Sequence, residues 1–173
     1  MESFLGLDLT RNYSFFTVHL HHPTINPQAY TLQVPAAFLV IALPHAYTIT
    51  AGAKGTFDNC SPRSHKNNIE NCSYLDKANK QFLLRAKAAT ENGFETLGLY
   101  ASGLAAANFA GVPTPTVNAL GFGYLASRVA YNIAYLWLQS DPNLARVRSL
   151  VWVTSIAFIV SLWVKAGNKM LSL

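Results

Sequence analysis

Long stretches without any charged side chain limit what this chain can fold into. No Asp, Glu, Lys or Arg occurs from Asn12 to Ala53, from Thr96 to Ser127, or from Ser149 to Val164. A helix needs roughly 20 predominantly apolar residues to cross a bilayer, and each stretch supplies most or all of such a helix. Only 12% of the 173 residues are charged, whereas about 25% are charged in an ordinary soluble domain. The pattern favours an integral membrane protein over a soluble two-domain enzyme or a disordered chain.

Prolines and glycines divide these stretches into four expected helices. The segment 111–116, GVPTPT, separates two helices, because prolines beside a glycine end a helix. Pro35 and Pro44 lie within the first apolar block, where neighbouring helices can satisfy the carbonyls that proline frees. We therefore expect an all-α, four-span membrane bundle over residues 31–168, preceded by a lumenal extension, 1–30. The expected helices are about 31–53, 77–111, 116–139 and 147–168, with a cytosolic loop, 54–76.

The Lys and Arg residues are distributed unevenly between the two sides of such a bundle. Loops 54–80 and 140–148 share one side, and the termini share the other. The first side holds Lys54, Arg63, Lys66, Lys77, Lys80, Arg146 and Arg148, and the second holds Arg11, Lys165 and Lys169. Cytosolic loops carry an excess of Lys and Arg, so we expect loops 54–80 and 140–148 in the cytosol. The cations form no basic run, which argues against a nucleic-acid partner.

One cation lies inside the expected third helix. Arg128 has long uncharged sequence on both sides, and such a residue costs about 3 kcal/mol on insertion scales and usually marks a function or a buried pair. Tyr131 and Tyr135 follow on the same helical face. Their hydroxyls can donate to an anion that Arg128 also holds. The alternative is a structural ion pair at Arg128 with two interfacial aromatic residues.

A second polar face lies on the expected second helix. Arg85, Asn92 and Glu95 project from one side, because a helix turns by about 100° per residue. Together they can hold a zwitterionic ligand, with Glu95 binding an ammonium group and Arg85 a carboxylate. In the alternative, Arg85 and Glu95 pair with Arg128 and with one another across helices.

Arg148 begins the expected fourth helix at the cytosolic edge. A guanidinium at this place can stabilise a thiolate by lowering the pKa of a thiol. The alternative is a membrane anchor of the positive-inside kind. Arg146 is the competing candidate, two residues away on a different helical face. Cys60 and Cys72 are too few for a four-cysteine zinc site, and we expect no metal.

Three motifs together resemble the MAPEG family, the membrane-associated proteins in eicosanoid and glutathione metabolism. The stretch 85–95, RAKAATENGFE, is similar to the second-helix signature R-A-x-x-A-x-x-N-x-x-E of that family. The pattern Arg128-x-x-Tyr131-x-x-x-Tyr135 resembles its third helix. The segment 148–152, RSLVW, resembles the start of its fourth helix. The motifs occur in the order of the family and cover most of residues 80–165.

The resemblance implies a homotrimer of left-handed four-helix bundles, with sites between adjacent subunits that open to cytosol and lipid. It also implies glutathione as a co-substrate, with Arg148 activating the thiol. Together with Arg85, which comes from the shared-face argument, the candidate binding residues are Arg85, Asn92, Glu95, Arg128, Tyr131 and Tyr135. The candidate catalytic residues are Arg148, Tyr131 and Glu95.

We therefore expect a microsomal glutathione transferase-like enzyme, located in the endoplasmic reticulum, that conjugates or isomerises a lipophilic electrophile. Members with established conjugation often have an arginine where this chain has Ala88. This difference favours an alternative, a glutathione-independent isomerase or cyclase that acts on a lipophilic secondary metabolite. A non-catalytic lipid-binding member is the other alternative. The N-terminal extension and the long loop 54–80 match no recognised part of the family. Such extensions on a divergent core resemble fungal members, some of which accompany secondary-metabolite pathways.

Overall fold

The structure is a computed structural model and describes residues 28–138 and 144–172. Over this part of the chain it contains helices and no strand, so the expected all-α fold is confirmed. The long elements are α1 (Gln28–Tyr47), α3 (Lys77–Phe109), α4 (Thr114–Ile133) and α5 (Ala145–Leu171). The short ones are the π-helical turns η1 (Thr48–Gly52) and η3 (Ala134–Leu138), the 3-10 turn η2 (Pro62–Ser64) and α2 (His65–Asn71). Most of the expected extension, 1–30, and part of loop 140–148 lie outside the described residues.

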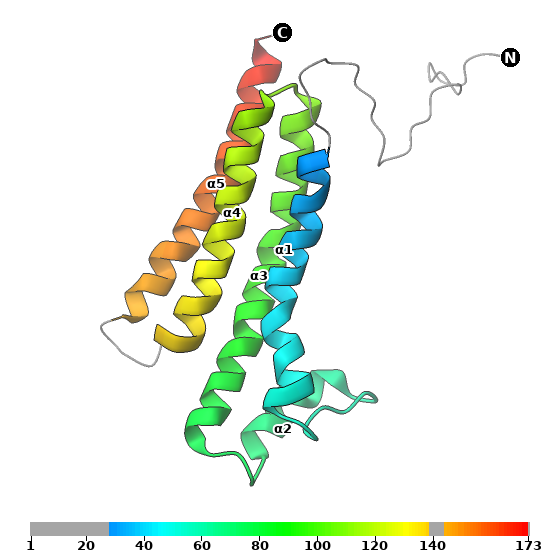
Figure 1. The fold of residues 1–173 in the computed structure, drawn as a ribbon, viewed down its shortest axis with the longest axis vertical. Coiled ribbons are helices and arrows are strands. Elements are labelled where there is room, and N and C mark those ends of the chain that lie inside the picture. Colours follow the sequence, from blue (N-terminus) through cyan, green and yellow to red (C-terminus); the bar gives the residue numbers. More distant parts are fainter. Residues whose placement is uncertain (1–27, 139–143, 173) are drawn as a thin grey trace, which may run out of the picture.

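The four long helices form one bundle (Figure 1). The beginning of α1 and the end of α5 lie at one end of it, and α2 lies at the other. With 33 residues, α3 is about 50 Å long at 1.5 Å per residue. Its first turns extend past the ends of α4 and α5 (Figure 1). The α2 end is therefore formed by α1, η1, α2 and the first part of α3.

Local sequence signals set the boundaries of α3 and α4. Asp76 caps the start of α3, because its carboxylate accepts a hydrogen bond from the Asn79 N–H at 2.7 Å. After α3 ends, Gly111 adopts a φ of 73°, which glycine tolerates without steric cost. Pro113 and Pro115 follow, and α4 begins between them at Thr114. The turn expected at 111–116 therefore separates these two helices.

The largest buried cluster lies between α1, α3, α4 and α5 and is built around two stacked tyrosines. The rings of Tyr100 and Tyr124 are 4.0 Å apart and nearly parallel, with an interplanar angle of 20°. The Tyr124 hydroxyl is 2.9 Å from Thr96 Oγ1, and the Tyr100 hydroxyl donates to the Gly121 carbonyl at 3.1 Å. This end of the bundle therefore satisfies its buried polar groups internally.

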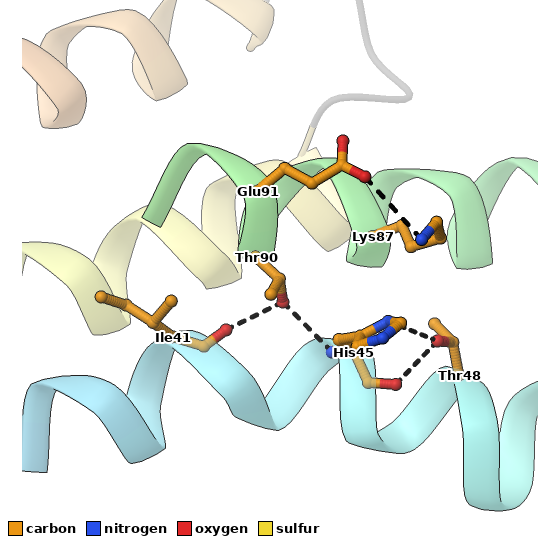
Figure 2. A network of polar contacts seen from close by, with 6 residues as sticks. All are labelled: Ile41, His45, Thr48, Lys87, Thr90 and Glu91. Carbon is orange, nitrogen blue, oxygen red and sulfur yellow. Dashed lines mark hydrogen bonds and ion pairs between the residues drawn. The ribbon is translucent and has the colours of Figure 1, made fainter. Parts of the chain in front are cut away.

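Proline frees backbone groups in α1, and side chains of two other helices bind them. Pro44 lacks the N–H that would bond the Val40 carbonyl, and Asn132 Nδ2 of α4 donates to that carbonyl at 2.8 Å. One residue along, the Thr90 hydroxyl of α3 accepts from the His45 N–H at 3.2 Å and donates to the Ile41 carbonyl at 2.8 Å (Figure 2). These contacts join α1 to α3 and α4 at the level of Pro44.

Two helices of the described part are long and apolar enough to cross a membrane, Leu32–Gly52 and Arg146–Leu171. Within the most apolar 18-residue window of each helix, only 22% and 17% of the residues are buried in the molecule. Their apolar side chains therefore face outwards, as in a membrane helix and unlike the core helix of a soluble protein. We expected four spans, but α3 and α4 are not among the helices that qualify. Both carry the polar and charged side chains described below.

The expected loop 54–76 is partly helical and packs against the bundle. The Asn68 side chain donates to the Thr56 carbonyl at 2.9 Å, and Lys80 Nζ donates to the Glu70 carbonyl at 2.8 Å. His65 is fully buried, with its ring 5.2 Å from that of Phe57 and 6.0 Å from that of His45. The segment is therefore an ordered cap on the α2 end. Both cysteines are free thiols, Cys60 exposed and Cys72 buried.

Candidate functional site

A cleft of about 590 Å³ lies between α3, the α4–η3 helix and the first turns of α5. Its lining residues are Ala88, Glu91, Asn92, Glu95, Tyr131, Tyr135, Arg148, Ser149, Trp152 and Val153. Five of them were predicted from the sequence: Asn92, Glu95, Tyr131, Tyr135 and Arg148. Asn92 and Arg148 are 56 positions apart in the sequence, and they line the same cleft because three helices meet there.

The wall formed by α3 presents an amide and two carboxylates. Asn92 Nδ2 donates to Glu95 Oε2 at 3.4 Å, which orients both side chains along the wall. Asn92 Oδ1 is buried and receives no hydrogen bond. Glu95 is exposed, and within the described residues it forms no ion pair with Arg85 or Arg128. The wall therefore retains one acceptor and one carboxylate for a ligand that carries N–H or ammonium groups.

Across the cleft, two guanidinium groups and two tyrosine rings form a continuous row. The Arg128 guanidinium lies 4.3 Å from the centre of the Tyr131 ring, and the Arg148 guanidinium 5.1 Å from that of Tyr135. The two rings are 5.5 Å apart with an interplanar angle of 51°. Both arginines thus lie within the range of favourable cation–π contact. The hydroxyls of both tyrosines make no hydrogen bond within the described part of the chain.

The π-helical turn η3 helps to align this row. Tyr135 belongs to η3, one turn beyond Tyr131 at the end of α4. A π-helix has more residues per turn than an α-helix, so the angle between successive residues is smaller. This keeps Tyr135 near the face of Tyr131 over a spacing of four residues. Single π turns of this kind occur frequently at functional sites.

The structure places Arg128 behind the cleft wall. Its side chain is fully buried, Tyr131 lies between it and the cleft, and it is not a lining residue. None of its three nitrogens has a hydrogen-bond acceptor among the described residues. The structural ion pair considered as an alternative is therefore absent from this part of the chain. A buried guanidinium without a hydrogen-bond acceptor is energetically costly even beside an aromatic ring, which points to a role other than stability.

Arg85 also lies apart from the cleft, although it shares a helical face with Asn92 and Glu95. A separation of seven residues corresponds to about 10 Å along the helix axis, and Arg85 is not a lining residue. Its Nε is buried without a hydrogen-bond partner. The two arginines at the start of α5 also differ, because Arg148 lines the cleft whereas the exposed Arg146 does not.

Several lining residues were missed by the sequence argument. Glu91 precedes Asn92 and lies one turn before Glu95, so its position on the second helix was a usable signal. Trp152 follows Arg148 by four residues on the same face of α5. Both Trp152 and Val153 are exposed and give the cleft an apolar side. Ala88 lines the cleft at the position where the resemblance led us to look for an arginine.

The comparison with known families agrees with the resemblance found in the sequence. The model of the MAPEG family matches residues 31–168, a range that contains nearly all of the four long helices and the whole cleft. No curated protein and no solved structure matches the chain. The family match, the helical bundle and the two outward-facing apolar helices together indicate a membrane protein. The chain therefore belongs to the MAPEG family.

Proposed function

We propose that this chain is a glutathione transferase-like enzyme embedded in the membrane. Membership of the MAPEG family supports a role in membrane-bound glutathione or eicosanoid metabolism. The observation that carries the more specific proposal is the composition of the cleft. It combines Asn92 and Glu95 on one wall with Tyr131, Tyr135 and Arg148 on the other. These groups match the parts of glutathione, a peptide with an ammonium group, amides, carboxylates and a thiol.

In this proposal Glu95 binds the ammonium group and the free Asn92 Oδ1 accepts from a peptide N–H. Arg148 stabilises the thiolate, because a nearby cation lowers the pKa of a thiol. The Tyr131 hydroxyl donates to an anionic part of the ligand. The thiolate sulfur then attacks an electrophilic carbon, forming a C–S bond, while the leaving group departs with its electron pair. Arg148 contributes electrostatic stabilisation of the kind that often lowers a barrier by about 3 kcal/mol.

The second substrate in this proposal is lipophilic and arrives from the bilayer. The exposed side chains of Trp152 and Val153 offer it an apolar surface beside the thiolate. We also propose that the bundle spans the membrane of the endoplasmic reticulum four times, with loops 54–80 and 140–148 in the cytosol. The enzyme would act as a homotrimer, with each cleft completed by an adjacent subunit.

Calorimetry on the detergent-purified protein tests this function directly. We expect glutathione to bind with a Kd between about 1 μM and 1 mM, and we expect Glu95→Gln to abolish the heat signal. Glu70→Gln is a matched control, because Glu70 is exposed on α2, outside the cleft. Absence of binding to the wild-type protein would contradict the proposal. Loss of binding in the control variant would assign the effect to altered folding.

Ala88 favours a second candidate function. With a methyl group where established conjugating members often have an arginine, the cleft offers one fewer cation to an anionic peptide. The alternative is an isomerase or cyclase that uses Glu95, Tyr131 and Tyr135 as acid–base groups without glutathione. Thiol consumption with a generic aryl halide supports the transferase, whereas conversion of a lipophilic intermediate without thiol supports the alternative. A non-catalytic lipid-binding protein would give neither result.

A further inference from the structure

Lys87 lies next to the cleft, and the proposed function does not use it. Its Nζ is 3.8 Å from Glu91 Oε1. The two side chains differ in exposure, 14% for Lys87 and 65% for Glu91. Glu91 also lines the cleft, whereas Lys87 does not. Figure 2 shows the ion pair, which joins a nearly buried cation to a carboxylate that lines the cleft.

Helix stability gives a poor account of this pair. Pairs at positions i and i+4 stabilise a helix most when the glutamate precedes the lysine, and here the lysine precedes the glutamate. The lysine is also largely withdrawn from water, which is costly for an ammonium group. The arrangement therefore costs more than an exposed pair of the same residues would cost.

Two imidazoles lie near enough to Lys87 to interact with its charge. His45 belongs to α1 and His65 to α2, and both interact electrostatically with Lys87. The pKa of His65 is lowered by burial, then by Lys87 and then by His45, so this imidazole is neutral at pH 7. His45 interacts with Glu91 as well. The Lys87 ammonium, 3.8 Å from the Glu91 carboxylate, is the cation that offsets that carboxylate.

Without that offset, the α3 wall would present two carboxylates about one turn apart, Glu91 and Glu95. Two such charges attract an ammonium group but repel carboxylates and a thiolate, and like charges brought together at a binding surface are strongly unfavourable. Glutathione has two carboxylates and one ammonium group, and its thiolate adds a further negative charge. A doubly acidic wall would therefore select against it.

We propose that Lys87 is a specificity-determining residue of the cleft, which neutralises Glu91 so that the cleft accepts an anionic thiol ligand. Glu95 is then the acidic group that remains for the ammonium of the ligand. This inference rests on the proposed function, because it concerns the ligand of the same cleft. Lys87 would thus select the charge of the ligand although it is not one of the residues that line the cleft.

A double-mutant cycle with two ligands tests the proposal. The ligands are glutathione and its glycine amide, which differ by one negative charge. Calorimetry at pH 7 would be carried out on the full chain in detergent, for the wild-type protein, Lys87→Met, Glu91→Gln and the double variant. Lys87→Arg keeps the charge, and Lys66→Met is a matched control because Lys66 is exposed on α2. Thermal melting of each sample checks that it is folded.

We expect Lys87→Met to weaken glutathione binding about tenfold and to weaken binding of the amide by only about threefold. The double variant should return both affinities to within about twofold of wild type, and Lys87→Arg should behave as wild type. Glu91→Gln should shift the ratio of the two affinities in the opposite direction, towards glutathione. This last variant keeps the proposal testable even when Lys87→Met does not fold.

Equal losses for both ligands in Lys87→Met, or a double variant that is as weak as Lys87→Met, would overturn the proposal. Those results would leave the proposed function intact, because wild-type glutathione binding would still be observed. Failure of the wild-type protein to bind either ligand would overturn both inferences together.

Discussion

The bundle contains two tyrosine pairs that differ in burial and in the hydrogen bonds of their hydroxyls. Tyr100 and Tyr124 are fully buried and stacked, with hydroxyls that bind Gly121 and Thr96 of the protein itself. Tyr131 and Tyr135 are tilted against one another, lie beside two guanidinium groups and have hydroxyls without a partner in the described chain. We call Tyr100 and Tyr124 the closed pair, because both hydroxyls are hydrogen-bonded within the buried core. The second pair lines an open cleft.

The comparison assigns different roles to two tyrosines of the same helix, stability to Tyr124 and ligand binding to Tyr131. Tyr124 and Tyr131 are both on α4, two turns apart, so their intrinsic helical preferences are the same. The partners decide their roles, because a buried polar group that is already paired contributes to folding, whereas an unpaired one is available to a ligand. If this contrast holds, substitutions in the two pairs should differ in their effects on stability and on ligand binding.

Removal of a ring from the closed pair should have the largest effect. We expect Tyr100→Ala to lower the free energy of unfolding by about 3–5 kcal/mol, since it leaves a cavity in the tightly packed cluster. Tyr135→Ala should cost about 1 kcal/mol, because Tyr135 borders a cleft that already exists. Denaturant titration of both variants in detergent measures the difference. Equal losses would remove the distinction between the two pairs.

Replacement of Arg128 should have an effect of opposite sign. Its buried guanidinium has no hydrogen-bond acceptor in the described chain, so we expect Arg128→Met to raise the free energy of unfolding by about 2 kcal/mol. The same variant should bind glutathione more weakly, because the Tyr131 ring loses the cation behind it. Arg146→Met is the control, since Arg146 is exposed. A less stable Arg128→Met would indicate a structural role for this charge.

Removal of a single hydroxyl should have a smaller effect, which falls on stability in the closed pair and on ligand binding in the pair at the cleft. Tyr124→Phe removes the hydrogen bond between Tyr124 and Thr96 Oγ1, which still donates to the Gly93 carbonyl, and should cost about 1 kcal/mol of stability with ligand affinity unchanged. Tyr131→Phe should leave stability within about 0.5 kcal/mol and weaken glutathione binding about tenfold. Melting temperature and calorimetry on the same two samples give both numbers. An affinity loss in Tyr124→Phe would show that the closed pair contributes to the cleft.

The pH dependence of stability should come from outside both pairs. Burial lowers the pKa of His65 below its ordinary value of 6.5, so protonation of this residue favours the unfolded chain. Stability should be full above about pH 6.5 and fall as the pH decreases below that value. His65→Gln should flatten this part of the profile, measured as melting temperature from pH 5 to 8. An unchanged slope would assign the effect to another group.

Positions within a helix were predictable, and distances between helices were not. The spacing of Tyr131 and Tyr135, and of Asn92 and Glu95, follows from helical periodicity, and all four residues line one cleft. Arg85 lies on the same face of α3 as Asn92 and Glu95 but about two turns before Asn92 along the helix axis. An argument from the angle around the helix does not detect this displacement. Arg128 precedes Tyr131 by only three residues, yet the rotation of α4 buries it behind that ring.

Other features depend on contacts that no sequence pattern specifies. The pairing of Lys87 with Glu91 is visible as a spacing of four residues, but the burial of Lys87 depends on how the helices pack and not on its own spacing. The three motifs identified the family, because they occur in the right order on successive helices. The ordered cap at 54–76 had no such signal.

The contacts around Pro44 of α1 lead to an expectation about sequence change over evolutionary time. Pro44 leaves the Val40 carbonyl to Asn132, and the Thr90 hydroxyl bridges Ile41 and His45. A one-residue insertion or deletion in this part of α1 would mismatch both side chains at once. We therefore expect Pro44, Thr90 and Asn132 to co-vary. A relative that has lost the proline is then free to lose the asparagine and the threonine as well. Length changes should accumulate elsewhere, in the connections.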